Sequence, residues 1–153
     1  FMQAAQQTFI SSTFWTERIG PSAALKTLEV MERTKSWETI TEMGNNISKR
    51  WKSLSDKYEL DINTWGLPAL SGFTFNSKND LSYKTFITQE MLKKGYLAAN
   101  SIYVCTEHTQ EIVDGYFEAL DPLFKIIKDC EDGLDIKTML EGPISHSGFK
   151  RLN

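Results

Sequence analysis

The sequence predicts an α+β domain in which a small, largely antiparallel sheet carries helices on one face. Three observations lead to this fold class. A long segment in the first half has one continuous apolar helical face, and a stretch rich in aromatic and β-branched residues with interspersed glycines follows it. A second long helical pattern lies near the end of the chain. The expected order of elements is ααββαβα, and its strands are too few and too short for a doubly wound sheet.

Two helices are expected before the first strand. Gly20-Pro21 predicts the start of the first, with the proline at the first helical position, where its missing N–H costs nothing; the helix should end near Arg33. The second should run from about Trp37 to Tyr58. Its apolar residues recur at steps of three and four and form one face: Ile40, Met43, Ile47, Trp51, Leu54 and Tyr58.

The strands are expected in the middle of the chain. Ile62–Trp65 and Ser71–Phe75 have strand composition, and Gly66, Pro68 and Gly72 punctuate them. A further strand region is expected within Tyr96–Cys105.

Capping residues place the remaining helices. Asp80 is expected to cap a third helix that Gly95 closes, and Thr109 is expected to cap a fourth. Pro122 should kink the fourth helix or split it in two. Its expected inner face consists of Ile112, Tyr116, Leu120, Leu123 and Ile127. A short final helix should end at Gly142.

Composition indicates an ordinary soluble domain. The 153 residues fit one domain with a real core, the net charge is only −3, and the basic residues are scattered, which argues against a nucleic-acid partner. No apolar run approaches the roughly 18 residues of a membrane span, so no membrane partner is expected. Cys105 and Cys130 are far apart and belong to no metal motif, which favours two free, mostly buried thiols in a reducing cytoplasm.

The residues alone give no complete catalytic constellation. His108 precedes the capping Thr109 and is interpreted as a turn residue. His146 lies near Lys150 and Arg151 in a polar tail that could hold an anion or be simply solvated. The acidic residues at helix ends and on polar faces are expected to be solvated: Glu29, Glu32, Asp129, Glu131 and Asp132.

The opening loop is the exception. It gathers four hydroxyls just before a helix N-terminus, and hydroxyls beside the positive end of a helix dipole can cradle a phosphate. The alternative is a Ser/Thr-rich cap with Phe14 and Trp15 packed against the domain. The four hydroxyl residues are Ser11, Ser12, Thr13 and Thr16.

Three separated segments resemble one known family. They are "AAQQTFISSTFWTERIGPSAALKTLEVM", "MLKKGYLAANSIYVCTEHTQEIVDGYFEAL" and "GPISHSGFKRLN". Together they resemble the C-terminal part of class III pyridoxal-phosphate (PLP)-dependent aminotransferases, and most of all glutamate-1-semialdehyde aminomutase-like members. The resemblance implies the small C-terminal domain of a fold-type I PLP enzyme, with residues 1–20 as a cofactor-facing interdomain loop and 21–153 as the small domain.

The resemblance also implies roles for individual residues. Thr13 would reach across a homodimer interface to the phosphate of the cofactor held by the other subunit, with Ser12 beside it and Thr16 as a rival. Glu17 and Arg18 replace smaller residues that are more usual in the family. The residues expected to bind a small amino-acid or keto substrate are Tyr103, His146, Lys150 and Arg151.

The family's Schiff-base lysine and its glycine-rich context do not occur in this sequence. Lysines such as Lys26, Lys49 and Lys84 lie on polar helical faces, whereas imine chemistry needs a desolvated lysine. The large PLP domain is therefore expected to come from elsewhere. The chain opens with Phe1 and is expected to be a piece of a longer enzyme. This piece alone is expected to be inactive.

Two hypotheses stay open at this point. As part of an enzyme, the domain should expose an apolar surface where the large domain packs. As a stand-alone binding or dimerisation module of the same fold, it should bind no cofactor in any longer form. Within the enzyme hypothesis, aminotransferase and aminomutase are not distinguished.

Overall fold

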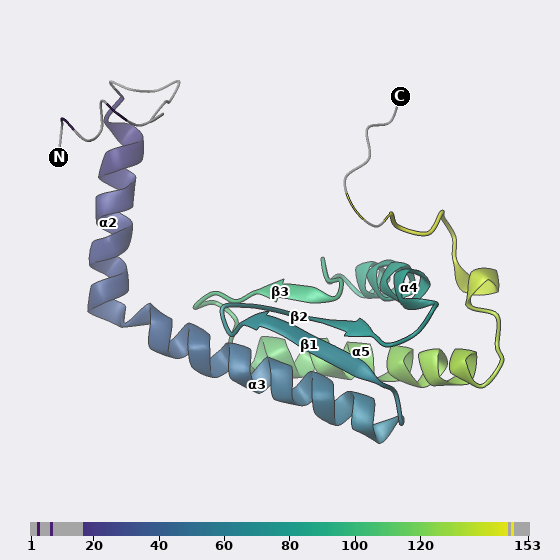
Figure 1. Cartoon of the computed structure of the whole chain (residues 1–153). Coiled ribbons are helices and arrows are strands. Elements are labelled where there is room, and N and C mark those ends of the chain that lie inside the picture. Colours follow the sequence, from purple (N-terminus) through teal and green to yellow (C-terminus); the bar gives the residue numbers. More distant parts are fainter. Residues whose placement is uncertain (1–2, 4–6, 8–16, 147, 149–153) are drawn as a thin grey trace. The chain divides into compact units, whose positions relative to one another are not determined.

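A computed structural model describes residues 3, 7, 17–146 and 148. The chain divides into two compact units, Phe1–Ser36 and Trp37–Asn153. The elements follow one another as α2 (Ile19–Thr34), α3 (Ser36–Lys57), β1 (Ile62–Leu67), β2 (Leu70–Phe75), α4 (Asp80–Lys93), β3 (Ser101–Tyr103), α5 (Gln110–Glu131) and the 3₁₀ turn η1 (Ile136–Met139) (Figure 1). The predicted order ααββαβα is confirmed, and the short final helix is the 3₁₀ turn.

The described part of the first unit is essentially one helix, α2, which buries none of its side chains. It begins at Ile19, so the prediction that Pro21 takes the first helical position is wrong. Pro21 is the third helical residue, still within the first turn, where backbone N–H groups have no partner inside the helix. At the other end Lys35 adopts a left-handed conformation and its N–H donates to the carbonyl of Met31.

The sheet of the second unit has three antiparallel strands in the order β1-β2-β3. A two-residue turn joins β1 to β2, so that Leu67 pairs with Leu70 and Ile62 with Phe75. The third strand is much shorter than the predicted Tyr96–Cys105, because only Ser101–Tyr103 pair with β2. The predicted antiparallel sheet is confirmed.

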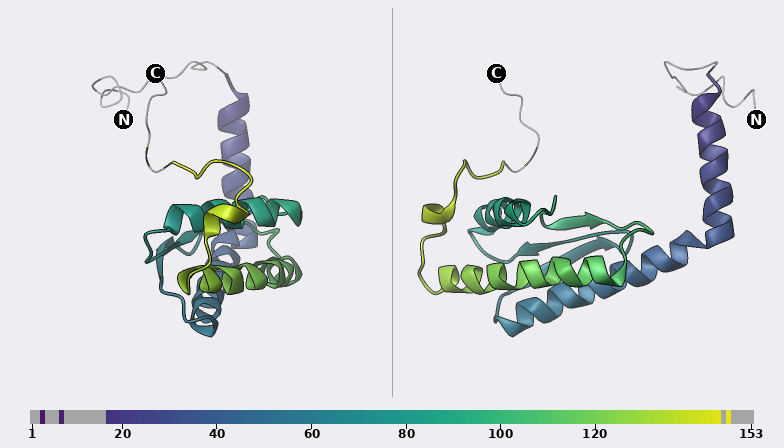
Figure 2. Two further views of the ribbon diagram at one scale, coloured as in Figure 1. Left: turned by 90° about the vertical axis from the view of Figure 1, so that its right-hand side faces the viewer. Right: turned by 180° about the vertical axis from the view of Figure 1, so that it is seen from behind.

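Helices α3 and α5 cover the same face of the sheet, and α4 lies beside its end (Figures 1 and 2). Alternation along β2 directs Phe73 and Phe75 into this layer, where both are buried. The core unites side chains from all the helices of this unit, and its largest fully buried members are Trp51, Tyr83, Phe73, Phe86 and Phe124. The α+β class with helices on one face is therefore confirmed.

Polar contacts fix α3 and α5 in a parallel register. Asn46 donates to Gln110, Arg50 to Asp114 and Lys57 to Asp121, and each pair is separated by 64 residues along the chain. A constant offset over three turns requires the two helices to run in the same direction. Arg50 also lies over the ring of Phe117, with its guanidinium carbon 4.2 Å from the ring centroid.

Beneath this polar ladder, a buried hydrogen bond joins the same two helices. The indole N–H of Trp51 donates to the hydroxyl of Tyr116 over 3.0 Å. Trp51 is fully buried, and its ring packs against Phe73 of β2 at a centroid distance of 5.0 Å. Burial raises the pKa of Tyr116. One indole thus connects α3, α5 and the sheet.

Two of the predicted helix-end residues, Thr109 and Gly95, are as expected, whereas the final helix ends at Met139 and not at the predicted Gly142. The Thr109 hydroxyl caps α5 by accepting from the N–H of Ile112, and Gly95 follows α4 with a φ of 85°. The prediction for Asp80 is wrong: it is the first residue of α4, and its carboxylate accepts from the N–H of Phe75. Asp80 therefore ties the end of β2 to the helix start.

Pro122 lies inside a continuous α5, so the alternative that it splits the helix is wrong. Leu123 and Phe124, immediately after it, are buried and hold the helix on the core. The inner face of α5 differs from the prediction at one position, since Ile112 is half exposed while Val113 is buried.

The two cysteines are free, as predicted. Cys130 is buried at the end of α5, whereas Cys105 is exposed, so the expectation of two mostly buried thiols is wrong for Cys105. No helix in the described ranges combines the length and apolarity needed to cross a bilayer.

Replacing Tyr116 with Phe should destabilise the domain by about 1–3 kcal/mol, because the buried indole N–H of Trp51 loses its acceptor. The free energy of unfolding in urea measures this. Tyr103→Phe is the matched control: Tyr103 is 75% exposed and makes no side-chain hydrogen bond to the described residues. Equal losses in the two variants would contradict the role of the Trp51–Tyr116 bond.

The Asp121 carboxylate makes stability depend on acid pH. Burial alone raises its pKa, but hydrogen bonds from Lys57 and Tyr58 outweigh burial and hold the pKa below its usual value. The stabilisation is therefore complete above the unfolded pKa of about 3.9 and is lost as the pH falls through the lower folded pKa.

Asp121→Asn should accordingly flatten the loss of stability between about pH 5 and about pH 2, as followed by urea unfolding at each pH. Asp129→Asn on the same helix is the control, because Asp129 is exposed and makes no side-chain hydrogen bond or ion pair with the described residues. If Asp121→Asn loses as much stability at acid pH as the unchanged protein does, the Asp121 contacts do not stabilise the fold.

Candidate functional site

The face of the sheet opposite α3 and α5 carries large exposed apolar side chains. Trp65, Leu67, Leu70 and Tyr103 are 46%, 73%, 36% and 75% exposed. The register pairs Leu67 with Leu70 and Leu70 with Tyr103, which puts them on one face. These four residues and Gly72 are named the open sheet face. Soluble domains rarely expose such a group without a partner.

Gly72 has no side chain, and this leaves room for the Trp65 ring to lie on the open sheet face. Trp65 pairs with Gly72 across β1 and β2, and a Cβ at Gly72 would come within 2.4 Å of the indole ring. The same Cβ would come within 2.8 Å of the carbonyl oxygen of Asn100. The missing side chain therefore lets the indole pack on the strand while its outer surface stays exposed.

Tyr103, predicted to bind substrate, lies on this open sheet face at the last position of β3. His108 follows Tyr103 by five residues and is half-buried. Its Nδ1 accepts a hydrogen bond from the N–H of Cys105 over 3.0 Å. This bond closes the turn between β3 and α5, as the interpretation of His108 as a turn residue requires.

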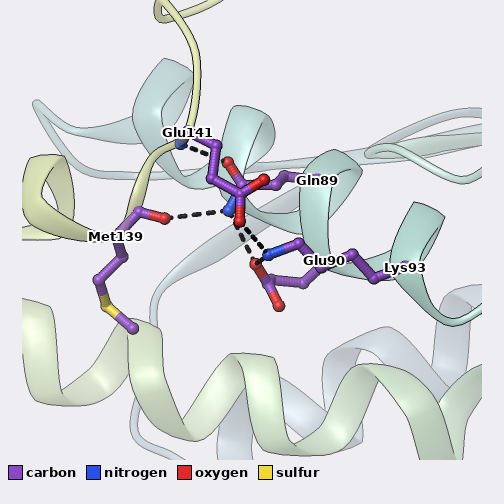
Figure 3. A network of polar contacts seen from close by, with 5 residues as sticks. All are labelled: Gln89, Glu90, Lys93, Met139 and Glu141. Atoms are coloured by element: carbon purple, nitrogen blue, oxygen red, sulfur yellow. Dashed lines mark hydrogen bonds and ion pairs between the residues drawn. The ribbon is translucent and has the colours of Figure 1, made fainter.

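The C-terminal segment is fastened along α4 (Figure 3). The Gln89 amide donates to the carbonyl of Met139 over 2.9 Å and accepts from the N–H of Glu141 over 2.7 Å. Lys93 bridges the carboxylates of Glu90 and Glu141, both at 2.7 Å. We name this segment, residues 139–145, the C-terminal strap.

A second attachment lies one turn earlier on α4. The N–H of Ser145 donates to the Thr85 hydroxyl over 3.0 Å. His146, predicted to bind substrate, follows directly and is exposed. Within the described residues, Tyr103 and His146 share no hydrogen bond and line no common cavity, so the structure does not bring these two predicted residues together.

The other predicted site residues lie outside the described residues. These are the phosphate-binding candidates Ser12, Thr13 and Thr16 and the carboxylate-binding candidates Lys150 and Arg151. Their roles stay predictions.

No family model matches the chain. A 3-aminobutyryl-CoA aminotransferase of Cloacimonas acidaminovorans (strain Evry) is 25% identical over 126 residues, which cover 78% of this chain and 30% of the relative. The chain also superposes on the FumI protein of Sphingopyxis sp. MTA144, solved in its PLP internal aldimine form, with a TM-score of 0.72 and 20% identity. That match covers 90% of this chain and 34% of FumI, and it shows the fold.

The resemblance to the C-terminal portion of a class III aminotransferase is confirmed. The chain spans about a third of the length of these two proteins.

Three of the described lysines do not suit covalent attachment of a PLP cofactor. Lys57, Lys93 and Lys128 each donate to a carboxylate, and these hydrogen bonds raise their pKa. A lysine that forms an imine needs the opposite shift, a lowered pKa. Lys26 and Lys49 are exposed on their helices.

Two buried side chains that could act as nucleophiles have raised pKa values, and the described ranges hold no metal-ligand cluster. Burial raises the pKa of the Cys130 thiol, which disfavours the reactive thiolate. Burial and a hydrogen bond to Glu131 raise the pKa of Tyr83 to about 12. No group of three or more His, Cys, Asp or Glu side chains in these ranges is placed to hold a metal ion.

Sequence reasoning missed the open sheet face and the anchors of the C-terminal strap. "TWGL" alternates an aromatic residue and a leucine around Gly66, which is a usable signal for two apolar side chains on one strand face. The sequence carries no such signal for Gln89, because its side-chain amide binds the backbone of a segment about 50 residues away only in the folded chain. Glu131, expected to be solvated, accepts from Ser77 and Tyr83.

Gln89→Ala should loosen the C-terminal strap, since it removes both hydrogen bonds to the backbone. Hydrogen exchange at the Glu141 amide should speed up by roughly 30-fold, as expected when two bonds are lost with a net contribution of about 1 kcal/mol each. Gln89→Glu should have a smaller effect, because its carboxylate still accepts from Glu141 but cannot donate to Met139.

Thr88→Ala is the control for the strap, because the exposed Thr88 hydroxyl bonds only to the carbonyl of Lys84 in its own helix. Faster exchange in Thr88→Ala than in Gln89→Ala would contradict the clamp.

Proposed function

We propose that this chain is the C-terminal small domain of a PLP-dependent aminotransferase whose large domain and catalytic lysine come from the remainder of a longer protein. The observation that supports it most is the match of 90% of the chain to about a third of a PLP enzyme. A domain of that kind needs a surface for the large domain, and the open sheet face has the apolar character of such a surface.

Helix α2 offers a second apolar surface of this kind. Leu25, Leu28 and Met31 follow one another at steps of three along one side of the helix, and they are 69%, 61% and 37% exposed. Helices in proteins gain most of their stability from packing an apolar face. We assign this side of α2 to the large domain of the intact enzyme.

In the intact enzyme, Thr13 and Ser12 would bind the cofactor phosphate of the second subunit of a homodimer, with Thr16 as the rival. Hydroxyls preceding a helix N-terminus suit this, since α2 directs its positive end toward the preceding segment. PLP, when bound, supplies an electron sink at the substrate amine carbon.

The substrate we propose is a small amino acid or keto acid, or a β-amino acyl thioester like the one named for the Cloacimonas relative. Arg151 and Lys150 would pair with a substrate carboxylate, with Arg151 suited to bidentate hydrogen bonding, and His146 and Tyr103 would line the site. Ser145, which precedes His146, is bonded to Thr85 of α4, and the C-terminal strap would carry these side chains to the substrate.

An aminomutase of the glutamate-1-semialdehyde type is the second candidate within the same chemistry. Its support is the sequence resemblance to glutamate-1-semialdehyde aminomutase-like members. It predicts that amino donor and acceptor are the same molecule, so that the product is an isomer of the substrate. A cytoplasmic location is part of the proposal, because Cys105 and Cys130 are unpaired.

The test is expression of the longer reading frame that contains this chain, followed by PLP titration and assay with amino donors. The longer protein should bind PLP, show its visible absorbance and transfer an amino group. Thr13→Val should weaken PLP binding about tenfold or more, because a hydrogen bond to a charged group contributes about 1.5–3 kcal/mol.

Thr27→Val is the matched control, because the exposed Thr27 hydroxyl bonds only to the carbonyl of Ala23 in its own helix. A longer protein that binds no PLP would favour the stand-alone binding or dimerisation module. PLP binding that is weakened by Thr16→Val and not by Thr13→Val would transfer the phosphate role to Thr16.

A further inference from the structure

Strand β1 lies at an edge of the sheet, and one of its long sides is free. Within the described residues β1 (Ile62–Leu67) pairs only with β2, and five of its six residues are exposed. The other edge strand, β3 (Ser101–Tyr103), has only three residues. A short edge is one way in which proteins protect a sheet from adding strands. The long edge open to a further strand is therefore that of β1.

The register identifies the backbone groups on this free side. Just before β1, the carbonyl of Asp61 accepts from the N–H of Asn76. Because alternate residues of an antiparallel strand turn their N–H and C=O toward the partner, Asn63 faces β2 whereas Ile62 and Thr64 face away from it. Among the described residues, no hydrogen bond reaches the outward N–H or C=O of Ile62 or Thr64.

The segment that carries this edge has no charged residue. Residues 62–75, INTWGLPALSGFTF, contain no Asp, Glu, Lys, Arg or His, in a chain of which 24% is charged. Proteins commonly place lysines, inward-pointing charges or prolines on an exposed edge, because its unpaired N–H and C=O groups otherwise recruit another strand. β1 has none of these devices. Its free edge is therefore suited to being covered by a strand.

The neighbouring side chains indicate what kind of strand fits. Trp65 and Leu67 are 46% and 73% exposed on the open sheet face, so they lie next to the position of a strand added beside β1. Apolar side chains at alternate positions of that strand would pack on them, as cross-strand pairs do. A charged side chain would find no opposite charge on β1. Gly66, with a φ of 93°, ends the regular part of the edge, so a short segment is enough.

A single extended segment fits this edge better than a second copy of the chain does. A strand needs about 4.8 Å beside β1. A second copy would also bring its own α3 next to this one, and packed helix axes need about 8–10 Å. Here α3 runs along the β1 side of the sheet and meets the β1–β2 turn, where a Cβ at Gly44 would come within 1.9 Å of the carbonyl oxygen of Pro68 (Figure 1).

We propose that an extended, uncharged segment with alternating apolar side chains adds to the sheet as a fourth strand beside β1. This rests on the proposed function, because the segment belongs to the part of the longer protein outside this chain. The chain spans about a third of the length of the two similar proteins, so a protein of that length has further residues to supply it. Main-chain hydrogen bonds to Ile62 and Thr64 hold the strand, and Trp65 and Leu67 select its apolar side chains.

The test is amide hydrogen exchange, resolved to single residues, on the 153-residue chain and on the longer protein. In the 153-residue chain the amide of Thr64 should exchange fast and that of Asn63 slowly, because only Asn63 faces β2. In the longer protein the Thr64 amide should exchange roughly tenfold more slowly or slower still, whereas the Asn63 amide should change little.

Two proline variants make the test specific. Thr64→Pro removes an N–H that faces away from β2, and an edge strand tolerates such a proline. It should speed exchange at the Ile62 amide roughly tenfold in the longer protein, but by less than about twofold in the 153-residue chain. Asn63→Pro is the matched control, because it removes an N–H that faces β2 and should speed exchange along β1 in both proteins.

Three results would overturn the proposal. One is a Thr64 amide that exchanges as fast in the longer protein as in the 153-residue chain. Another is protection of Ile62 that Thr64→Pro leaves unchanged, since a cover without main-chain hydrogen bonds would behave in this way. The third is protection in the 153-residue chain that increases with its concentration, which would assign the edge to a second copy.

Failure of this proposal and failure of the proposed function are distinguishable. PLP binding by the longer protein is measured by its visible absorbance, independently of exchange at β1. A longer protein that binds PLP with an unprotected Thr64 amide would retain the proposed function and lose the added strand. A longer protein that protects Thr64 and binds no PLP would do the reverse.

Discussion

The hydrogen bond from the Trp51 indole to the Tyr116 hydroxyl is the contact on which the rest of the domain depends. It joins residues of two helices that are 65 positions apart in the sequence, in a core where an unpaired polar atom would be destabilising. The indole also packs on Phe73, so the same side chain sets the distance between the helix layer and the sheet. The ladder of pairs from Asn46 to Asp121 then fixes how far α3 can slide along α5.

Placing both long helices on one face of the sheet has a consequence for the other face. A three-stranded sheet cannot cover itself, and the apolar side chains Trp65, Leu67 and Tyr103 are left exposed. The helices thus bury one face of the sheet, whereas its other face stays exposed to solvent. An exposed apolar group of this size is the kind of surface that packs against a partner.

Several polar contacts outside the core hold individual chain segments in position. Gln89 and Thr85 hold the C-terminal strap by its backbone groups, and the ion pair of Lys93 with Glu141 adds a side-chain contact. Asp80 secures the end of β2 in the same way. Hydrogen bonds to backbone atoms of this kind place loops on a rigid scaffold, which is how functional side chains are commonly positioned.

The sequence by itself determined the elements whose signals are local. The apolar period of α3, the Thr109 cap and Gly95 after α4 were all readable, because each depends on residues within one or two turns. The family resemblance was readable as well. Only the tertiary structure decided that β3 has three paired residues, that α5 continues through Pro122 and that Asp80 bonds to Phe75. It also decided that Cys105 is exposed. These outcomes depend on which surfaces meet across long separations in the chain, and packing free energy between distant segments overrides local preference.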